Sequence, residues 1–334
     1  MSTRVGVGSH RYEVVEGWGK LPEDWRFVDV AGVAVNSEDN VIILNRGTHP
    51  IVVLDRAGNL LGAFGDGEIR GAHGVCVGPD DAIFCADSGD HTVKKYGPDG
   101  KLLMVLGIRD QPSDTGYDRS LDWPQREVKR AAGPFHCPTN VAVSQTGEIF
   151  VSDGYGNARV HKFAPDGTLL RSWGNPGHGP GEFWIPHGIA VDRESIVYVA
   201  DRENSRVQRF SPGGEYLGEW SWVYRPTDLF IDQAGYAFVA EFGYRAGPVP
   251  GQLEPPGEVK PRGRVSIRAL DGSVLAAWGE GPDDCAPGFF FAPHAVSIDS
   301  HGDLYVGEVV YSAGQRGKLV SPECHTLQKF ARVS

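Results

Sequence analysis

The sequence predicts an all-β fold, a six-bladed β-propeller that forms one domain over residues 1–334. Three observations predict it. A two-strand segment recurs six times along the chain, and the last repeat lacks a strand that the N-terminal segment can supply. The chain also holds 45 Gly and 23 Pro beside 40% hydrophobic residues. That composition is typical of many short strands joined by tight turns.

The recurring segment is an apolar run, a polar turn and a second apolar run that ends in Asp, Glu or Asn. This pattern predicts a β-hairpin. Its six copies are Gly32–Asn45, Gly74–Asp87, Asn140–Asp153, Gly188–Asp201, Asp228–Glu241 and Ala295–Glu308. Most copies continue with a third strand that ends in an aromatic residue and a fourth that ends in Trp-Gly or Phe-Gly. Four strands in each of six repeats predict six blades.

The two ends of the chain are complementary. The sixth repeat stops after its third strand, Thr326–Phe330, while Tyr12–Gly19 has the pattern of a fourth strand. We therefore expect the N-terminal strand to complete the last blade, which would leave no unpaired edge there.

Composition and charge limit the partners. A net charge of −11 without a long basic run is unfavourable for nucleic acid. No run of 18 apolar residues is available to span a membrane, and the N-terminal residues lack the apolar core of a signal peptide. Five scattered cysteines without a CxxC pair favour free thiols and a reducing compartment over a disulfide framework. We expect a cytoplasmic protein, and its oligomeric state is left open.

The long insertions all belong to one face. With first strands that begin at the top of the propeller, the loops 108–135, 246–263, 280–291 and 312–324 fall on that top face. Because function concentrates in loops held by a rigid scaffold, the top face is the expected working face.

Histidine occupies one register position in alternate blades. The residue just before each hairpin is, from blade one to blade six, Ala31, His73, Thr139, His187, Thr227 and His294. Alternate blades of a six-fold ring are 120° apart, so the three imidazoles would converge on the axis. Three nitrogens with an open fourth position are usual for catalytic zinc, although imidazole also suits Cu, Fe and Ni. Any one of these histidines alone would more often cap its strand.

Two arginines and a tyrosine share the same rim. Arg46 and Arg202 follow the end of the second strand in blades one and four, which would face each other. Their guanidinium groups suit a small carboxylate, and the alternative is a salt bridge with neighbours such as Asp201 or Glu203. Tyr155 lies between two histidine blades, where it could pack or act as acid or base.

The acids that end the second strands are expected to be structural. They would bind backbone N–H groups. They are Asp87, Asp153, Asp201, Glu241 and Glu308.

Several local motifs occur in order along the chain. They are SDGYGNAR at 152–159, ADREN at 200–204, NRGTH at 45–49 and the Pro-His pairs that contain His187 and His294. With these motifs the chain resembles the catalytic domain of peptidyl-α-hydroxyglycine α-amidating lyase, a six-bladed NHL-type propeller. The resemblance implies zinc held by His73, His187 and His294, with Arg46, Arg202 and Tyr155 as substrate-binding and catalytic residues.

Two departures from that family stand out. Ala295 replaces the family's Asp at a structural calcium site, so the resemblance does not carry Ca²⁺ over. Gly156 replaces a cysteine that secreted members pair with one at the position of Cys137, so that bridge is not expected.

We therefore expect a zinc-dependent carbon–nitrogen lyase that acts on an N-substituted α-hydroxy acid, a small-molecule carboxylate, and releases an amide or amine plus a glyoxylate-like product. One alternative is another metal-dependent propeller enzyme, a hydratase or a lactonase-like hydrolase. A second is a non-catalytic NHL interaction scaffold.

Overall fold

The structure is a computed structural model that describes residues 2–121, 126–244, 261–281 and 284–333. Most of the expected loop 246–263 lies outside these residues. The chain divides into two compact units, each described by itself: the first unit contains residues 1–66, 227–247 and 255–334, and the second unit contains residues 67–226 and 248–254. The expectation of one domain over 1–334 stays a prediction.

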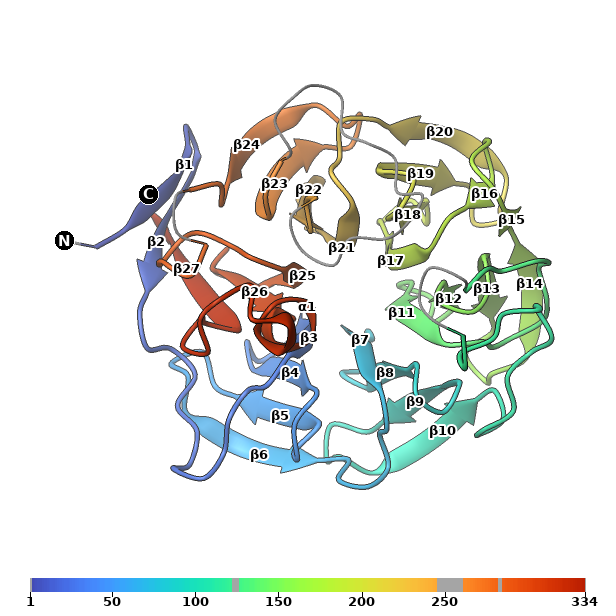
Figure 1. The fold of residues 1–334 in the computed structure, drawn as a ribbon, viewed down its shortest axis with the longest axis horizontal. Coiled ribbons are helices and arrows are strands. Elements are labelled where there is room, and N and C mark those ends of the chain that lie inside the picture. Colours follow the sequence, from blue (N-terminus) through green and yellow to red (C-terminus); the bar gives the residue numbers. More distant parts are fainter. Residues whose placement is uncertain (1, 122–125, 245–260, 282–283, 334) are drawn as a thin grey trace. The chain divides into compact units, whose positions relative to one another are not determined.

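The second unit contains three four-stranded antiparallel sheets and a short two-stranded ribbon (Figure 1). The first sheet has β7 (Ala72–Val77), β8 (Ile83–Asp87), β9 (Thr92–Tyr96) and β10 (Leu102–Leu106). The second has β11 (Pro138–Val143), β12 (Ile149–Asp153), β13 (Arg159–Phe163) and β14 (Leu169–Trp173). The third has β17 (Pro186–Val191), β18 (Val197–Asp201), β19 (Arg206–Phe210) and β20 (Tyr216–Trp220), and the ribbon pairs β15 (Asn175–Pro176) with β16 (Glu182–Phe183).

The first unit also contains three sheets. One has β3 (Val30–Val35), β4 (Val41–Asn45), β5 (Ile51–Leu54) and β6 (Leu60–Phe64). Another has β21 (Pro226–Ile231), β22 (Tyr236–Glu241), β23 (Arg264–Ala269) and β24 (Val274–Trp278). The third is five-stranded and has β1 (Arg4–Val7), β2 (His10–Val15), β25 (Pro293–Ile298), β26 (Leu304–Glu308) and β27 (Leu327–Val333). Three sheets in each unit make the six blades, so the predicted fold class, an all-β six-bladed propeller, is confirmed.

The N-terminal strand completes the last blade as predicted. Strand β2 pairs antiparallel with β27, and Tyr12 lies opposite Arg332. It begins at His10 and ends at Val15, earlier than the expected Tyr12–Gly19, because Glu16 and Gly17 form a turn. Strand β1, which was not predicted, pairs with β2 as a fifth, outermost strand.

Inner strands are apolar on both faces because neighbouring sheets cover them. In β12 and β18 every residue is buried, whereas β14 exposes Leu169 and Leu170 and buries Trp173. Such continuous apolar runs are typical of strands covered on both sides. This burial explains why the first two strands of each blade gave the clearest repeat.

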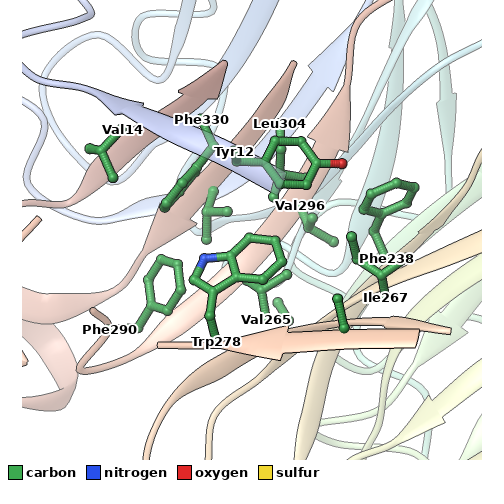
Figure 2. Close-up of a cluster of buried hydrophobic side chains, with 13 residues drawn as sticks. Tyr12, Val14, Phe238, Val265, Ile267, Trp278, Phe290, Val296, Leu304 and Phe330 are labelled. Atoms are coloured by element: carbon green, nitrogen blue, oxygen red, sulfur yellow. The ribbon is translucent and has the colours of Figure 1, made fainter. Parts of the chain in front are cut away.

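Aromatic side chains at the ends of outer strands fill the space between sheets of the first unit. Figure 2 shows Trp278 from β24 between Tyr12, Phe290 and Phe330. The Trp278 ring stacks on Tyr12 with 5.4 Å between ring centroids and meets Phe330 edge-on at 5.8 Å. The terminal Trp-Gly of this repeat therefore marks a packing contact with the next sheet.

Helix is confined, among the described residues, to the segment after β26, with α1 (Val310–Ala313) and η2 (Gln315–Gly317). Neither is long and apolar enough to cross a lipid bilayer.

The cysteine interpretation is wrong for one pair. Cys285 and Cys324 form a disulfide with 4.8 Å between their Cα atoms, while Cys76, Cys85 and Cys137 are not disulfide-bonded. The bridge joins the loop before β25 to the loop after β26. Because these strands are antiparallel, the two loops leave the sheet at the same end, and their 39-residue separation hid this proximity. The compartment stays a prediction.

Candidate functional site

The predicted site position is a bulge in the first strand of the blades. The ladder between β7 and β8 pairs Ala72 with Asp87 and then Gly74 with Ala86, so His73 is skipped. The same shift skips His187 in β17 and His294 in β25. A bulge leaves one extra residue outside the ladder and redirects its side chain. The backbone thus accounts for the shared register of the three histidines, a feature that the sequence analysis did not anticipate.

His73 presents Nε2 as a possible metal ligand. Its side chain is buried, and Nδ1 lies 2.6 Å from the carbonyl oxygen of Thr139. A carbonyl only accepts, so Nδ1 carries the proton and Nε2 carries the lone pair. A hydrogen bond of this kind from the second ring nitrogen is the usual way in which proteins fix a metal-binding imidazole.

His187 lies beside His73 in the same unit. Their ring centroids are 4.6 Å apart, and the two residues offer ligand atoms within 4.8 Å of each other. The hydroxyl of Tyr155 lies 3.3 Å from Nε2 of His187, and its ring meets His73 edge-on at 4.9 Å. The structure thus brings together three of the predicted site residues within the second unit.

A close backbone contact lets Tyr155 reach this position. A Cβ on Gly154 would lie 2.0 Å from the carbonyl oxygen of Pro186, the residue before His187. Only glycine allows the loop after β12 to approach β17 so closely.

Arg202 forms a salt bridge with a neighbouring acid and also lies at the predicted site. Its Nε donates to Glu203 at 2.7 Å, so the salt bridge is present, while Asp201 pairs with Arg206 instead. Its Nη1 lies 3.4 Å from the Tyr155 hydroxyl, and the guanidinium lies over the Tyr155 ring at 5.5 Å. Burial opposes the charge, but Glu203 and Tyr155 outweigh it and raise the pKa of Arg202. A permanently charged donor therefore lies against the phenol oxygen.

Glu203 holds Arg202 from the side away from Tyr155. This carboxylate is fully buried and also binds Arg225, with Nη2 at 2.9 Å and Nε at 3.1 Å. The two guanidinium groups keep the pKa of Glu203 low despite its burial. Glu203 is thus a positioning residue for Arg202.

His294 has the same local environment within the first unit. It is buried, and Nδ1 lies 2.8 Å from the carbonyl oxygen of Ala31, so Nε2 again carries the lone pair. Ala31 and Thr139 are themselves the bulged residues of their strands. His73 and His294 are therefore each oriented by the bulged residue of the neighbouring sheet in their own unit.

Arg46 lies near the start of α1 in the first unit. Its Nη1 is 3.7 Å from a carboxylate oxygen of Asp29 and 3.3 Å from the hydroxyl of Ser312, and 27% of its side chain is exposed. Burial raises the pKa of Asp29, and the Arg46 cation opposes that rise.

The acids at the ends of the second strands are structural, as expected. Asp87 accepts from the backbone N–H groups of Arg70 and Gly71, and Glu308 from those of Phe291 and Ala292. Glu241 differs, because it accepts hydrogen bonds from the side chains of Arg264, Ser266 and Arg268. Asp87 and Glu308 therefore tie the end of the second strand to the segment that enters the first.

The sequence analysis missed one further group. His91, His136 and Cys137 of the second unit are buried and offer metal-ligand atoms within 4.8 Å of one another. His91 and His136 could not be found from the repeat pattern, since neither occupies the bulge position of a first strand. His136, and not Cys137, packs against Gly156, where an added Cβ would lie 2.3 Å from the imidazole.

Comparison with known proteins agrees with this fold. The NHL repeat family matches residues 135–163 and 183–210. NHL repeat-containing protein 3 of Homo sapiens is 33% identical over 316 residues, which cover 89% of this chain and 81% of that protein. The chain therefore belongs to the NHL-repeat family of β-propeller proteins.

Relatives with a named activity match a smaller part of the chain. A probable peptidyl-alpha-hydroxyglycine alpha-amidating lyase of Caenorhabditis elegans is 34% identical over 167 residues, 49% of this chain and 43% of that protein. The peptidyl-glycine alpha-amidating monooxygenase of Mus musculus is 33% identical over 214 residues. This match covers 54% of the chain but only 20% of the mouse protein. The predicted resemblance to amidating lyases is confirmed.

Solved structures support the fold alone. A gluconolactonase from Xanthomonas campestris matches with a TM-score of 0.60 at 13% identity, over 97% of this chain and 90% of that one. A streptogramin B lyase matches with a TM-score of 0.57 at 13% identity, over 92% of this chain and 95% of that one.

Proposed function

We propose that this protein is a zinc-dependent lyase that cleaves the carbon–nitrogen bond of an N-substituted α-hydroxy acid. The products would be an amide or amine and a glyoxylate-like aldehyde acid. The observation that carries the proposal is the contact of Tyr155 with both His187 and Arg202 beside a second imidazole, His73. The named amidating-lyase relatives support the same reaction class.

The ion would be held by His73, His187 and His294. The donor set fits zinc, because His73 and His294 donate through Nδ1 to carbonyl groups and keep Nε2 as the ligand atom. His294 of the first unit would complete the set because, like His73, it occupies the bulge of its first strand and donates through Nδ1 to a backbone carbonyl. When bound, zinc supplies a Lewis acid that polarises the substrate hydroxyl.

Tyr155 would move the proton. Its phenol proton would go to the leaving nitrogen as the carbon–nitrogen bond breaks, and its phenol oxygen would take the proton of the substrate hydroxyl. The electron pair of the O–H bond then becomes the carbonyl of the aldehyde, and that of the C–N bond goes to nitrogen. The Arg202 guanidinium would stabilise negative charge on the phenol oxygen during this transfer.

Arg46 and Arg202 would bind the substrate carboxylate. Glu203 uses Nε of Arg202, so the Nη groups of its guanidinium are the part directed to the site. For Arg46, the partial exposure of the side chain and its contacts with Ser312 and Asp29 support a carboxylate-binding role at the rim.

A hydratase or hydrolase on the same metal is the second candidate, because the likeness to a gluconolactonase extends over nearly the whole chain. At 13% identity that likeness is one of fold, so it carries less weight than the amidating-lyase relatives. A non-catalytic scaffold remains the third candidate, since the name of NHL repeat-containing protein 3 states no activity.

The test is product analysis in water enriched in ¹⁸O. The purified protein is given N-acyl-α-hydroxyglycines with small and large acyl groups, and glyoxylate and the amide are identified by mass spectrometry. A lyase releases glyoxylate and an intact amide whose oxygen comes from the substrate. A carboxylic acid that forms from the acyl group and carries solvent oxygen would indicate hydrolysis, whereas the aldehyde oxygen of glyoxylate exchanges with water and is not used. Absence of glyoxylate from every substrate, with metal bound, would reject the proposed reaction.

A further inference from the structure

Three metal-ligand side chains gather outside the predicted histidine site. His91 lies in the turn between β8 and β9, and His136 and Cys137 lie just before β11. All three are at least 93% buried, with exposures of 7%, 5% and 2%. Their ligand atoms lie within 4.8 Å of one another. A soft sulfur and two imidazoles form a donor set that suits zinc and related transition metals.

The hydrogen bonds of the two histidines differ in what they leave for an ion. Nδ1 of His136 lies 2.9 Å from the carbonyl oxygen of Ser113, so it carries the proton and Nε2 carries the lone pair. Nδ1 of His91 accepts the backbone N–H of Cys137 at 3.0 Å, so its lone pair is directed at the cysteine. An ion bound at Nδ1 of His91 would replace this hydrogen bond.

Distances within the group approach those of a tetrahedral site. With Zn–S of about 2.3 Å and Zn–N of about 2.0–2.1 Å, a tetrahedral angle places sulfur and nitrogen about 3.5 Å apart. Sγ of Cys137 lies 3.6 Å from Nδ1 of His91. The remaining separations reach at most 4.8 Å, so small side-chain rotations would close the group around an ion.

We propose that His91, His136 and Cys137 form a second transition-metal site, of the two-histidine, one-cysteine type, which holds the loop that carries Tyr155. The backbone N–H of Tyr155 lies 3.4 Å from the carbonyl oxygen of Cys137, and that of Gly156 donates to the carbonyl of His136 at 2.9 Å. An ion at this site would fix the segment to which Tyr155 is attached. This inference goes beyond the proposed function and does not depend on it.

Cobalt binding tests the proposal, because cobalt(II) bound to a thiolate gives a near-ultraviolet charge-transfer band and cobalt(II) bound only to histidines does not. The full chain is stripped of metal with a chelator and titrated with Co²⁺. We expect the band in the wild type and in His73→Ala, and its loss together with one ion per chain in Cys137→Ser. Serine keeps the size and the positive φ of 60° at this residue.

Two further variants complete the experiment. Cys76→Ser is the matched control, since Cys76 is a half-buried thiol of the same unit that forms no disulfide, and it should keep the band. His136→Gln should also lose the band, and it decides the question if Cys137→Ser fails to fold by circular dichroism. No band in the wild type at saturating Co²⁺, or a band that persists in His136→Gln, would overturn the proposal.

Discussion

Breaking the Cys285–Cys324 disulfide should destabilise the protein by about 4 kcal/mol. The estimate follows from the loop-closure entropy that a cross-link over 39 residues removes from the unfolded chain. Reduction should also loosen α1, because buried Cys324 packs in one cluster with Val310 of α1 and with Phe291. Ser312 of α1 accepts a hydrogen bond from Arg46, so the disulfide contributes to the support of a predicted site residue.

The assay compares guanidinium unfolding of the oxidised and the reduced protein. Thiol titration in denaturant should find three thiols before reduction and five after it, because Cys76, Cys85 and Cys137 are not disulfide-bonded. The double variant Cys285→Ala/Cys324→Ala should unfold like the reduced wild type, and reductant should not change it further. Five thiols without reduction, or identical unfolding midpoints with and without reductant, would refute the reasoning.

Three other changes test single residues. Tyr155→Phe should lower turnover by roughly 10²–10⁴-fold with metal retained, because a proton-transfer group is lost. Tyr198→Phe is the control, since the Tyr198 hydroxyl donates to Asp192. An equal loss of turnover in both variants would exclude a specific role of Tyr155 in catalysis. Arg202→Lys keeps the charge but not the guanidinium fork, so KM for the α-hydroxy acid should rise about tenfold or more. Unchanged kcat and KM would show that Arg202 serves only as the ion-pair partner of Glu203. Burial lowers the pKa of His325 but Glu308, at 2.9 Å, outweighs it, so the folded-state pKa is raised. The resulting stabilisation is fully present below pH 6.5 and is lost as pH rises through the folded-state pKa. His325→Gln should therefore reduce the decrease in the free energy of unfolding between pH 6 and 9, measured by denaturant unfolding. An equal pH dependence of that free energy in wild type and variant would contradict the assignment.

The repeat made the blades predictable from the sequence, because strands buried on both faces must be apolar along their whole length. The closure of the last blade by β2 followed from one missing strand. Strand β1 was not predictable in this way, since it has no counterpart in the other repeats. The disulfide was also missed, because two loops that are distant in sequence meet only through the antiparallel pairing of β25 and β26.

The site histidines could be predicted because they share one position in the repeat. The recurrence of His before the hairpins of alternate blades selected His73, His187 and His294, and the second unit brings the first two together with Tyr155. The bulge that redirects these side chains left no mark in the residue pattern. Pairing between distant loops likewise hid the group of His91, His136 and Cys137, because no spacing rule connects them.

The metal content of single histidine variants tests the central claim most directly. In a Cys137→Ser background, which removes the second proposed site, the chain should bind one transition-metal ion, most readily zinc, by elemental analysis. His73→Ala, His187→Ala and His294→Ala should each lose that ion, because two remaining imidazoles hold it far more weakly. One ion per chain retained in His187→Ala would contradict the three-histidine site and the lyase mechanism built on it.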